Sequence, residues 1–173
     1  MYKFLFGICC LFFAASFVTP TIIVVKSIQF NQNCGGYIKQ AADANTVELS
    51  LSRLEKAIAY AEQHQLTQGY TSVLWKTEDE NIGFWYENLV ACRDELRTIA
   101  EKKDATQLEK SNILMKIRES LMDNNGESGD TITVPDGISR YPNNALWGWL
   151  TLLSVIIFAC SIGFGIFCLE EDY

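Results

Sequence analysis

Two long stretches without a charged side chain constrain this chain more than any other feature. The first covers residues 4–25, between Lys3 and Lys26, and the second covers residues 145–169. An α-helix rises about 1.5 Å per residue, so about 20 residues cross the roughly 30 Å hydrocarbon core of a bilayer. Both stretches are long enough. We therefore expect a two-pass membrane protein with a domain between its two transmembrane helices.

The first stretch has a rival interpretation as a cleaved signal peptide. Ala14, Ala15 and Ser16 follow a short apolar core, as small residues do at a signal cleavage site. The apolar run, however, continues to residue 25, and cleavage after Ser16 would leave an exposed apolar N-terminus. We therefore interpret residues 4–25 as an uncleaved span, kinked near Pro20 because proline cannot donate a helical hydrogen bond.

The segment between the spans, residues 26–144, has the composition of one small acidic domain. It holds 18 acidic and 13 basic side chains, and the basic ones form no cluster, so we expect no binding to nucleic acid. A short acidic tail, residues 170–173, follows the second span. The fold class we predict is all-α: two transmembrane helices flank an elongated, coiled-coil-like antiparallel bundle of three helices, with an extended return strap.

Apolar side chains at alternating spacings of four and three predict the first helix of this bundle. They are Val47, Leu51, Leu54, Ile58 and Ala61. The pattern reaches back to Tyr37 and so predicts one helix over residues 37–66. We expect Gly35 and Gly36 to break or bend the chain path before it. The loop over residues 67–76 would then lie at the outer tip, where its apolar side chains would be covered.

Two capping boxes predict the next two helices. Thr77, followed three residues later by a glutamate, begins a helix over residues 78–103. Thr106 stands in the same relation to a glutamate and begins a helix over residues 106–123. The polar stretch that follows is typical of an exposed loop. Two prolines then exclude a long helix, so we expect residues 131–144 to form an extended strap that returns the chain to the membrane.

The second span carries two features that are typical of membrane helices. Aromatic side chains of the interfacial kind gather at its start: Tyr141, Trp147 and Trp149. Small residues stand four apart within it, which allows another helix to approach closely: Ala159 with Gly163, and Ser161 with Gly165.

Of the six cysteines, only Cys34 and Cys92 lie outside the two spans. A hairpin of the first two helices would place them too far apart for a disulfide, which needs Cα atoms within about 7 Å. We expect Cys92 to be buried and Cys34 to be available for an intermolecular disulfide with a second copy. His64 is the only histidine, so the chain lacks a zinc ligand set, and we expect no metal and no cofactor.

The sequence favours a protein that binds rather than one that catalyses, because it offers no nucleophile with a base and no phosphate-binding loop. Our leading hypothesis is a non-enzymatic interaction or scaffold module, for example an accessory subunit of a membrane complex. It would contact membrane lipid and either a second copy of itself or another membrane protein. Aromatic side chains near the outer tip are the candidate partner contacts: Trp75, Phe84, Trp85 and Tyr86.

The alternative is a sensory domain that binds a small molecule and signals through a partner, a layout that resembles bacterial chemoreceptor input domains. Two spans place both chain ends on one side of the membrane. We expect the ends in the cytoplasm and residues 26–144 outside it, in the plasma (inner) membrane. Lys26 and Lys39 oppose this orientation, since basic residues favour the cytoplasmic side, but long loops translocate largely regardless of charge.

Overall fold

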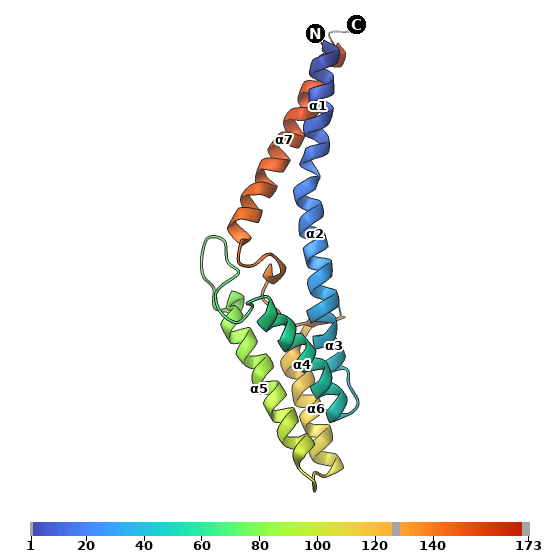
Figure 1. Cartoon of the computed structure of the whole chain (residues 1–173), viewed down its shortest axis with the longest axis vertical. Coiled ribbons are helices and arrows are strands. Elements are labelled where there is room, and N and C mark those ends of the chain that lie inside the picture. Colours follow the sequence, from blue (N-terminus) through green and yellow to red (C-terminus); the bar gives the residue numbers. More distant parts are fainter. Residues whose placement is uncertain (1, 126–128, 171–173) are drawn as a thin grey trace.

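The computed structural model describes residues 2–125 and 129–170 and is mostly helical (Figure 1). Its helices are α1 Tyr2–Ser16, α2 Val18–Phe30, α3 Gly36–Ala42, α4 Val47–Gln63, α5 Ile82–Glu101, α6 Gln107–Leu121 and α7 Asn144–Glu170. Its shorter elements are a π-helical turn, η1 Asn31–Gly35, the 3₁₀ turns η2 Glu78–Glu80 and η3 Ile138–Arg140, and the strands β1 Met122–Asn125 and β2 Gly129–Ile132.

Two helical runs are long and apolar enough to cross a membrane. They are Cys10–Ala42 and Asn144–Gly163. In the most apolar part of the first run only 6% is buried, and in that of the second only 11%. The core helix of a soluble protein would be mostly buried. The runs lie side by side near the two chain ends and diverge toward the rest of the molecule (Figure 1). The rings of Phe13 and Phe17 in the first run pack with the ring of Phe158 in the second, and the three pairwise centroid distances are 5.2–5.8 Å.

The first run is interrupted where the sequence predicts a kink. Helix α1 ends at Ser16 and α2 begins at Val18, two residues before Pro20. Proline has no N–H to donate to the Ser16 carbonyl four residues earlier. One residue further on, the Phe17 carbonyl accepts from both the N–H and the hydroxyl of Thr21, at 3.1 and 2.7 Å. The predicted kink near Pro20 thus takes the form of a break between α1 and α2.

The expected break at Gly35 and Gly36 is wrong, because these glycines continue the helix through a π-helical turn. The Gly36 N–H bonds to the Asn31 carbonyl, five residues back. A Cβ on Gly36 would lie only 2.9 Å from that carbonyl oxygen. A residue without a side chain therefore permits the wider turn, and α2, η1 and α3 form one rod.

A single helix over residues 37–66 is also wrong, because the chain reverses between α3 and α4. Helix α3 ends at Ala42, and Thr46 caps α4 by accepting a hydrogen bond from the Leu49 N–H. Helix α4 then packs back along η1 and α3. The buried Ser50 hydroxyl donates to the Ala41 carbonyl at 2.8 Å across the reversal. We call residues 26–143 the helical domain, with a proximal end beside the apolar helices and a distal end opposite.

This reversal inverts the direction of every later helix relative to our expectation. Helix α4 runs toward the proximal end, α5 runs away to the distal end, and α6 runs back (Figure 1). The sequence suggested a bundle of three helices, but four helical segments pack together. They are the η1–α3 part of the rod, α4, α5 and α6. The turn between α5 and α6 forms the distal end (Figure 1).

The second predicted helix starts later than residue 78. Helix α5 begins at Ile82, and the side chain of Asn81 caps it by accepting from the Phe84 N–H. The backbone explains the delay. The Thr71 N–H bonds to the Glu80 carbonyl, and the Ile82 N–H bonds to the Gly69 carbonyl. These bonds pair residues 80–82 with residues 69–71, and Asn81 between η2 and Ile82 is extended, so the α-helix begins only at Ile82.

The capping box at Thr106 and Glu109 is confirmed and starts α6. After α6 the chain forms a β-hairpin, not an irregular loop: β1 pairs antiparallel with β2, with Met122 opposite Ile132. Residues 126–128 of the predicted loop lie outside the described residues. The strap is shorter than expected. It passes from residue 133 through η3 to α7, because α6 has already brought the chain back toward the proximal end.

The core of the helical domain contains the predicted seam of α4, in which only Leu51 is partly buried, together with apolar side chains of the other helices. Helix α4 buries Val47, Leu54, Ile58 and Ala61; α5 buries Trp85, Leu89, Cys92 and Leu96; and α6 adds Ile117 and Leu121. The rod adds Phe30, Cys34 and Ile38. Helix α6 is the least buried of the four, and its Leu108 and Met115 face solvent.

Candidate interaction surface

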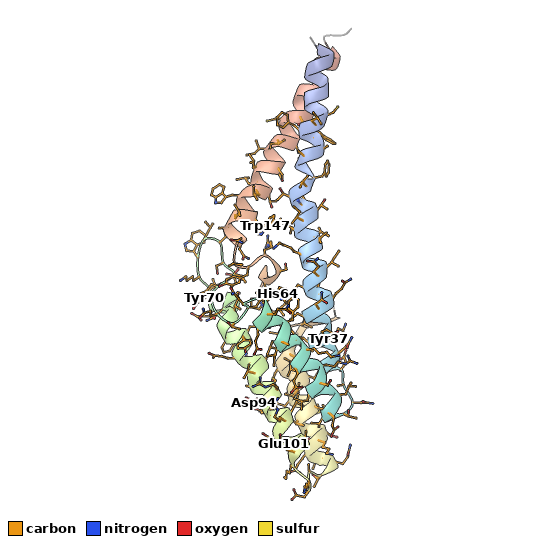
Figure 2. All side chains as sticks on the ribbon, in the orientation of Figure 1. Tyr37, His64, Tyr70, Asp94, Glu101 and Trp147 are labelled. Atoms are coloured by element: carbon orange, nitrogen blue, oxygen red, sulfur yellow. The ribbon has the colours of Figure 1, made fainter. Side chains whose placement is uncertain are left out.

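The four aromatic side chains that we expected at the outer tip lie at the proximal end instead. The reversal after α3 sends α4 toward the apolar helices, so the loop that follows it lies beside them. The Tyr141 hydroxyl, three residues before α7, donates to the Gln68 carbonyl at 2.9 Å and joins this loop to the second apolar helix. Figure 2 shows Tyr70 in the loop region, below Trp147 of α7.

Burial divides the four candidates into two groups. Trp75 is 78% exposed and Phe84 is 61% exposed, so both are available to a partner. Trp85 is only 5% exposed and belongs to the core. Tyr86 is half-buried, and its hydroxyl donates to Glu62 at 2.7 Å, a bond that raises the pKa of Tyr86. The structure therefore leaves Trp75 and Phe84 as the accessible pair.

Trp75 lies in a loop whose two legs are tied together. The Glu80 carboxylate accepts hydrogen bonds from the hydroxyls of Ser72 and Thr77, which flank the loop tip. These two bonds hold the pKa of Glu80 below its usual value. The Lys76 ammonium lies 5.3 Å from the centre of the Tyr70 ring, which adds a contact across the base. We call residues 72–77 the apolar loop.

The apolar loop exposes the side chains that the sequence led us to expect under cover. Val73 is 49%, Leu74 is 76% and Trp75 is 78% exposed. Exposing three consecutive apolar side chains costs free energy, because their apolar surface stays in contact with water instead of being buried. The tied legs therefore present a fixed apolar tip.

Phe84 lies in a groove between the start of α5 and the chain around β2. The groove has a volume of about 660 Å³. Its apolar lining is Phe84, Trp85, Ile132, Val134 and Pro135, and its acidic lining is Glu78, Asp79, Asp123 and Asp136. The described residues that line it include four carboxylates and no lysine or arginine. We call it the acidic groove.

The predicted aromatic belt is divided by the structure. Trp149 is exposed on the first turns of α7, and Trp147 is half-buried there with the Lys26 ammonium 5.3 Å from its ring. Tyr141 instead bonds Gln68, as described above. The belt thus joins the start of α7 both to Lys26 and to the base of the loop.

The two small-residue pairs of the second span lie on different faces. Ser161 is buried, as is Ser154 seven residues before it, whereas Ala159 and Gly163 are exposed. The surroundings of Gly165 lie outside the described side chains. The Ala159 and Gly163 pair therefore does not pack against α1 within this chain.

The expectation of an accessible Cys34 is wrong. Its side chain is completely buried, and its thiol lies 3.7 Å from the Ala57 carbonyl of α4. Cys92 is buried too, as expected, and both thiols are free. The π-helical turn places Cys34 in the core, a position that no residue spacing reveals. An intermolecular disulfide would require the domain to open.

The only histidine, His64, stands at the C-terminal end of α4. The His64 ring stacks on Tyr60 with centroids 3.9 Å apart. Within residues 2–125 and 129–170, no group of three or more histidine, cysteine or carboxylate side chains could hold a metal ion. Comparison with known proteins finds no family model, no curated relative and no solved structure that matches this chain.

Proposed function

We propose that this chain is a two-pass integral membrane protein whose helical domain binds another protein and has no enzymatic role. The two apolar helices, hardly buried within the molecule, support the membrane part. The acidic groove carries the interaction part. It brings the exposed aromatic side chain of Phe84 together with the carboxylates of Glu78, Asp79 and Asp136.

The groove defines the chemistry of its occupant. Aromatic side chains set in a pocket supply much of the affinity at protein interfaces, and Phe84 is placed for this. A rim of carboxylates adds specificity and raises the association rate for a segment of opposite charge. We infer that the occupant is a segment of a partner protein that carries apolar and basic side chains, from another membrane protein or from a second copy of this chain.

Orientation belongs to the same proposal. We place the helical domain outside the cytoplasm of the plasma (inner) membrane, with both chain ends inside. Protease protection in sealed vesicles of known sidedness tests this: the domain should be digested from the outside. Digestion only after the vesicles are opened would reverse the orientation and leave the groove's chemistry unchanged.

Site-specific photo-crosslinking tests the groove. Benzoylphenylalanine at Phe84 should crosslink a partner in native membranes, whereas the same group at Leu108 should not. Leu108 is a matched control, because it is 70% exposed and lies in the first turn of α6, directly after the turn that forms the distal end. Neutralising Asp79 and Asp136 to asparagine should reduce the Phe84 crosslink. Equal crosslinks at both positions, or a Phe84 crosslink that the neutral variant retains in full, would contradict the proposal. Copies with two different tags identify self-association.

The sensory alternative has one observation in its favour. The first apolar helix continues without a linker through α2, η1 and α3 into the core, so a change in the domain would be transmitted to the membrane. A thermal-shift screen of small metabolites on the full chain in detergent tests it. A saturable rise in the unfolding temperature would favour a sensor over an interaction module.

A further inference from the structure

We propose that the apolar loop inserts into the lipid interface of the membrane that α7 crosses, so that the helical domain is held against the bilayer at a third point. This inference rests on the proposed two-pass anchoring. It replaces our expectation that Trp75 contacts a protein partner. The occupant of the loop tip is lipid.

Position is the first argument. The segment that leads into the apolar loop is bonded to the chain just before α7. The Tyr141 hydroxyl, three residues before α7, donates to the Gln68 carbonyl. A Cβ on Gly69 would overlap the same hydroxyl, so loop and strap are in direct contact. The upper part of the loop reaches the height of the first turn of α7 (Figure 1). It therefore stands where that helix enters the membrane.

Continuity with exposed apolar surface on α7 is the second argument. Leu146 and Trp149 are exposed in the first turns of α7, at the level where tryptophan accumulates in membrane proteins. Leu74 and Trp75 are exposed in the apolar loop, and the upper part of that loop reaches the height of these first turns (Figure 1). The same interfacial layer that covers the first turns of α7 would cover the loop tip.

The construction of the loop is the third argument. Hydrogen bonds from Ser72 and Thr77 to Glu80 already fix both legs, so insertion requires little further ordering. Tryptophan prefers the interface because its ring is apolar while its N–H can bond there. Burial of Leu74 and Trp75 in lipid removes apolar area from water.

Charge determines which lipid the loop prefers. Lys76 is engaged with Tyr70, and Glu78 and Asp79 follow the loop tip at once. This charge distribution differs from the lysine and arginine clusters that bind anionic headgroups. Insertion is therefore driven by apolar contact and is insensitive to salt, and a zwitterionic surface is sufficient.

Quenching of Trp75 by brominated lipid tests the inference on the full chain. Replacing Trp147 and Trp149 with phenylalanine leaves the buried Trp85 as a shared background. In phosphatidylcholine vesicles with brominated acyl chains, we expect a large loss of the Trp75 signal relative to normal lipid, and a blue-shifted emission. The Trp75 signal is obtained by subtracting the fluorescence of the W75F variant, which retains only Trp85, from that of the chain with Trp75.

A matched control places tryptophan elsewhere on the same domain. In the W75F background, Leu108→Trp puts an equally exposed indole at the distal end, and it should be quenched by aqueous iodide but not by brominated lipid. Leu74→Glu should reduce the quenching of Trp75 severalfold, because a carboxylate resists insertion. Equal Trp75 emission in brominated and normal lipid would overturn the inference. This holds both if aqueous iodide quenches the indole and if a bound protein shields it from iodide.

Flotation separates this inference from the proposal on which it rests. All variants should float with the vesicles, because the two spans remain. If they float and Trp75 is unquenched by brominated lipid, only the loop inference fails. If the wild-type chain is released from vesicles by alkaline carbonate, the two-pass anchoring fails first.

Discussion

Replacing Ser50 with alanine tests the chain reversal that organises the helical domain. The Ser50 hydroxyl is completely buried and donates to the Ala41 carbonyl at 2.8 Å. In one straight helix these residues would stand nine positions, about 14 Å, apart and could not bond. The bond therefore exists only because α4 folds back on α3.

Two opposing effects decide the size of the change. Removing a buried hydrogen bond costs about 1–2 kcal/mol when the acceptor keeps little compensation. The Ala41 carbonyl keeps only a long bond of 3.4 Å from the Ala44 N–H. Alanine favours a helix over serine by about 0.5 kcal/mol. We expect Ser50→Ala to lower the free energy of unfolding by about 0.5–1.5 kcal/mol.

Ser52→Ala is the matched control, because Ser52 is exposed on the same helix two residues later. It gains the helix preference and loses no buried bond, so it should raise the free energy of unfolding by about 0.5 kcal/mol. Guanidinium unfolding of the full chain in mild detergent, followed by tryptophan fluorescence, measures both. Equal stabilisation by the two variants would refute the reversal.

Three further predictions concern the core and the caps. Leu54→Ala, at a fully buried position of α4, should cost about 2–5 kcal/mol, whereas Leu108→Ala should change stability by less than about 0.5 kcal/mol in the same assay. Hydrogen bonds from Lys102 and from the Thr106 N–H lower the pKa of Glu109 to about 2, so its stabilising effect is full above pH 4.5 and is lost as the pH falls toward 2. The difference in unfolding midpoint between wild type and Glu109→Gln should therefore vanish over that range, and a constant difference would contradict the assignment. Cys34 should resist maleimide until guanidinium unfolds the domain, as read by peptide mass spectrometry; labelling of the folded chain would contradict its burial.

Local signals in the sequence predicted the helices whose ends depend on local chemistry. The seam of α4 follows from the spacing of Val47, Leu54 and Ile58, and the start of α6 follows from Thr106 and Glu109. Both depend on contacts within one turn, which the sequence states directly. The break near Pro20 was predictable for the same reason.

The reversal after α3 was missed because the apolar spacing continues across it. Ala41, Ala44 and Val47 stand three apart, so the pattern of one helix merges with that of the next. Thr46 was a usable signal, since a threonine before an apolar periodic run favours an N-cap. The π-helical turn at Gly36 had no such signal, because glycine is more often a breaker than a partner in a wider turn.

The candidate site could be predicted as a set of residues but not as a surface. Trp75 and Phe84 were identifiable as aromatic residues outside the core seam, but Trp85 is their neighbour in sequence and is buried. The acidic groove needs Phe84 of α5 and Val134 of the strap side by side. These positions are fifty residues apart, and only the hairpin after α6 brings them together.

The number of helices explains why the aromatic features gather at one end. Three helices would leave the chain at the distal end, so a long strap would have to return it to the second span. With the reversal at residues 43–46, the rod and α5 run outward while α4 and α6 run back, and only a short strap remains. The segments after α4 and after α6 then both lie toward the proximal end. The first holds the apolar loop and the second leads to Tyr141, which bonds the first. One turn of a few residues therefore decides that Trp75 lies toward the proximal end rather than at the outer tip.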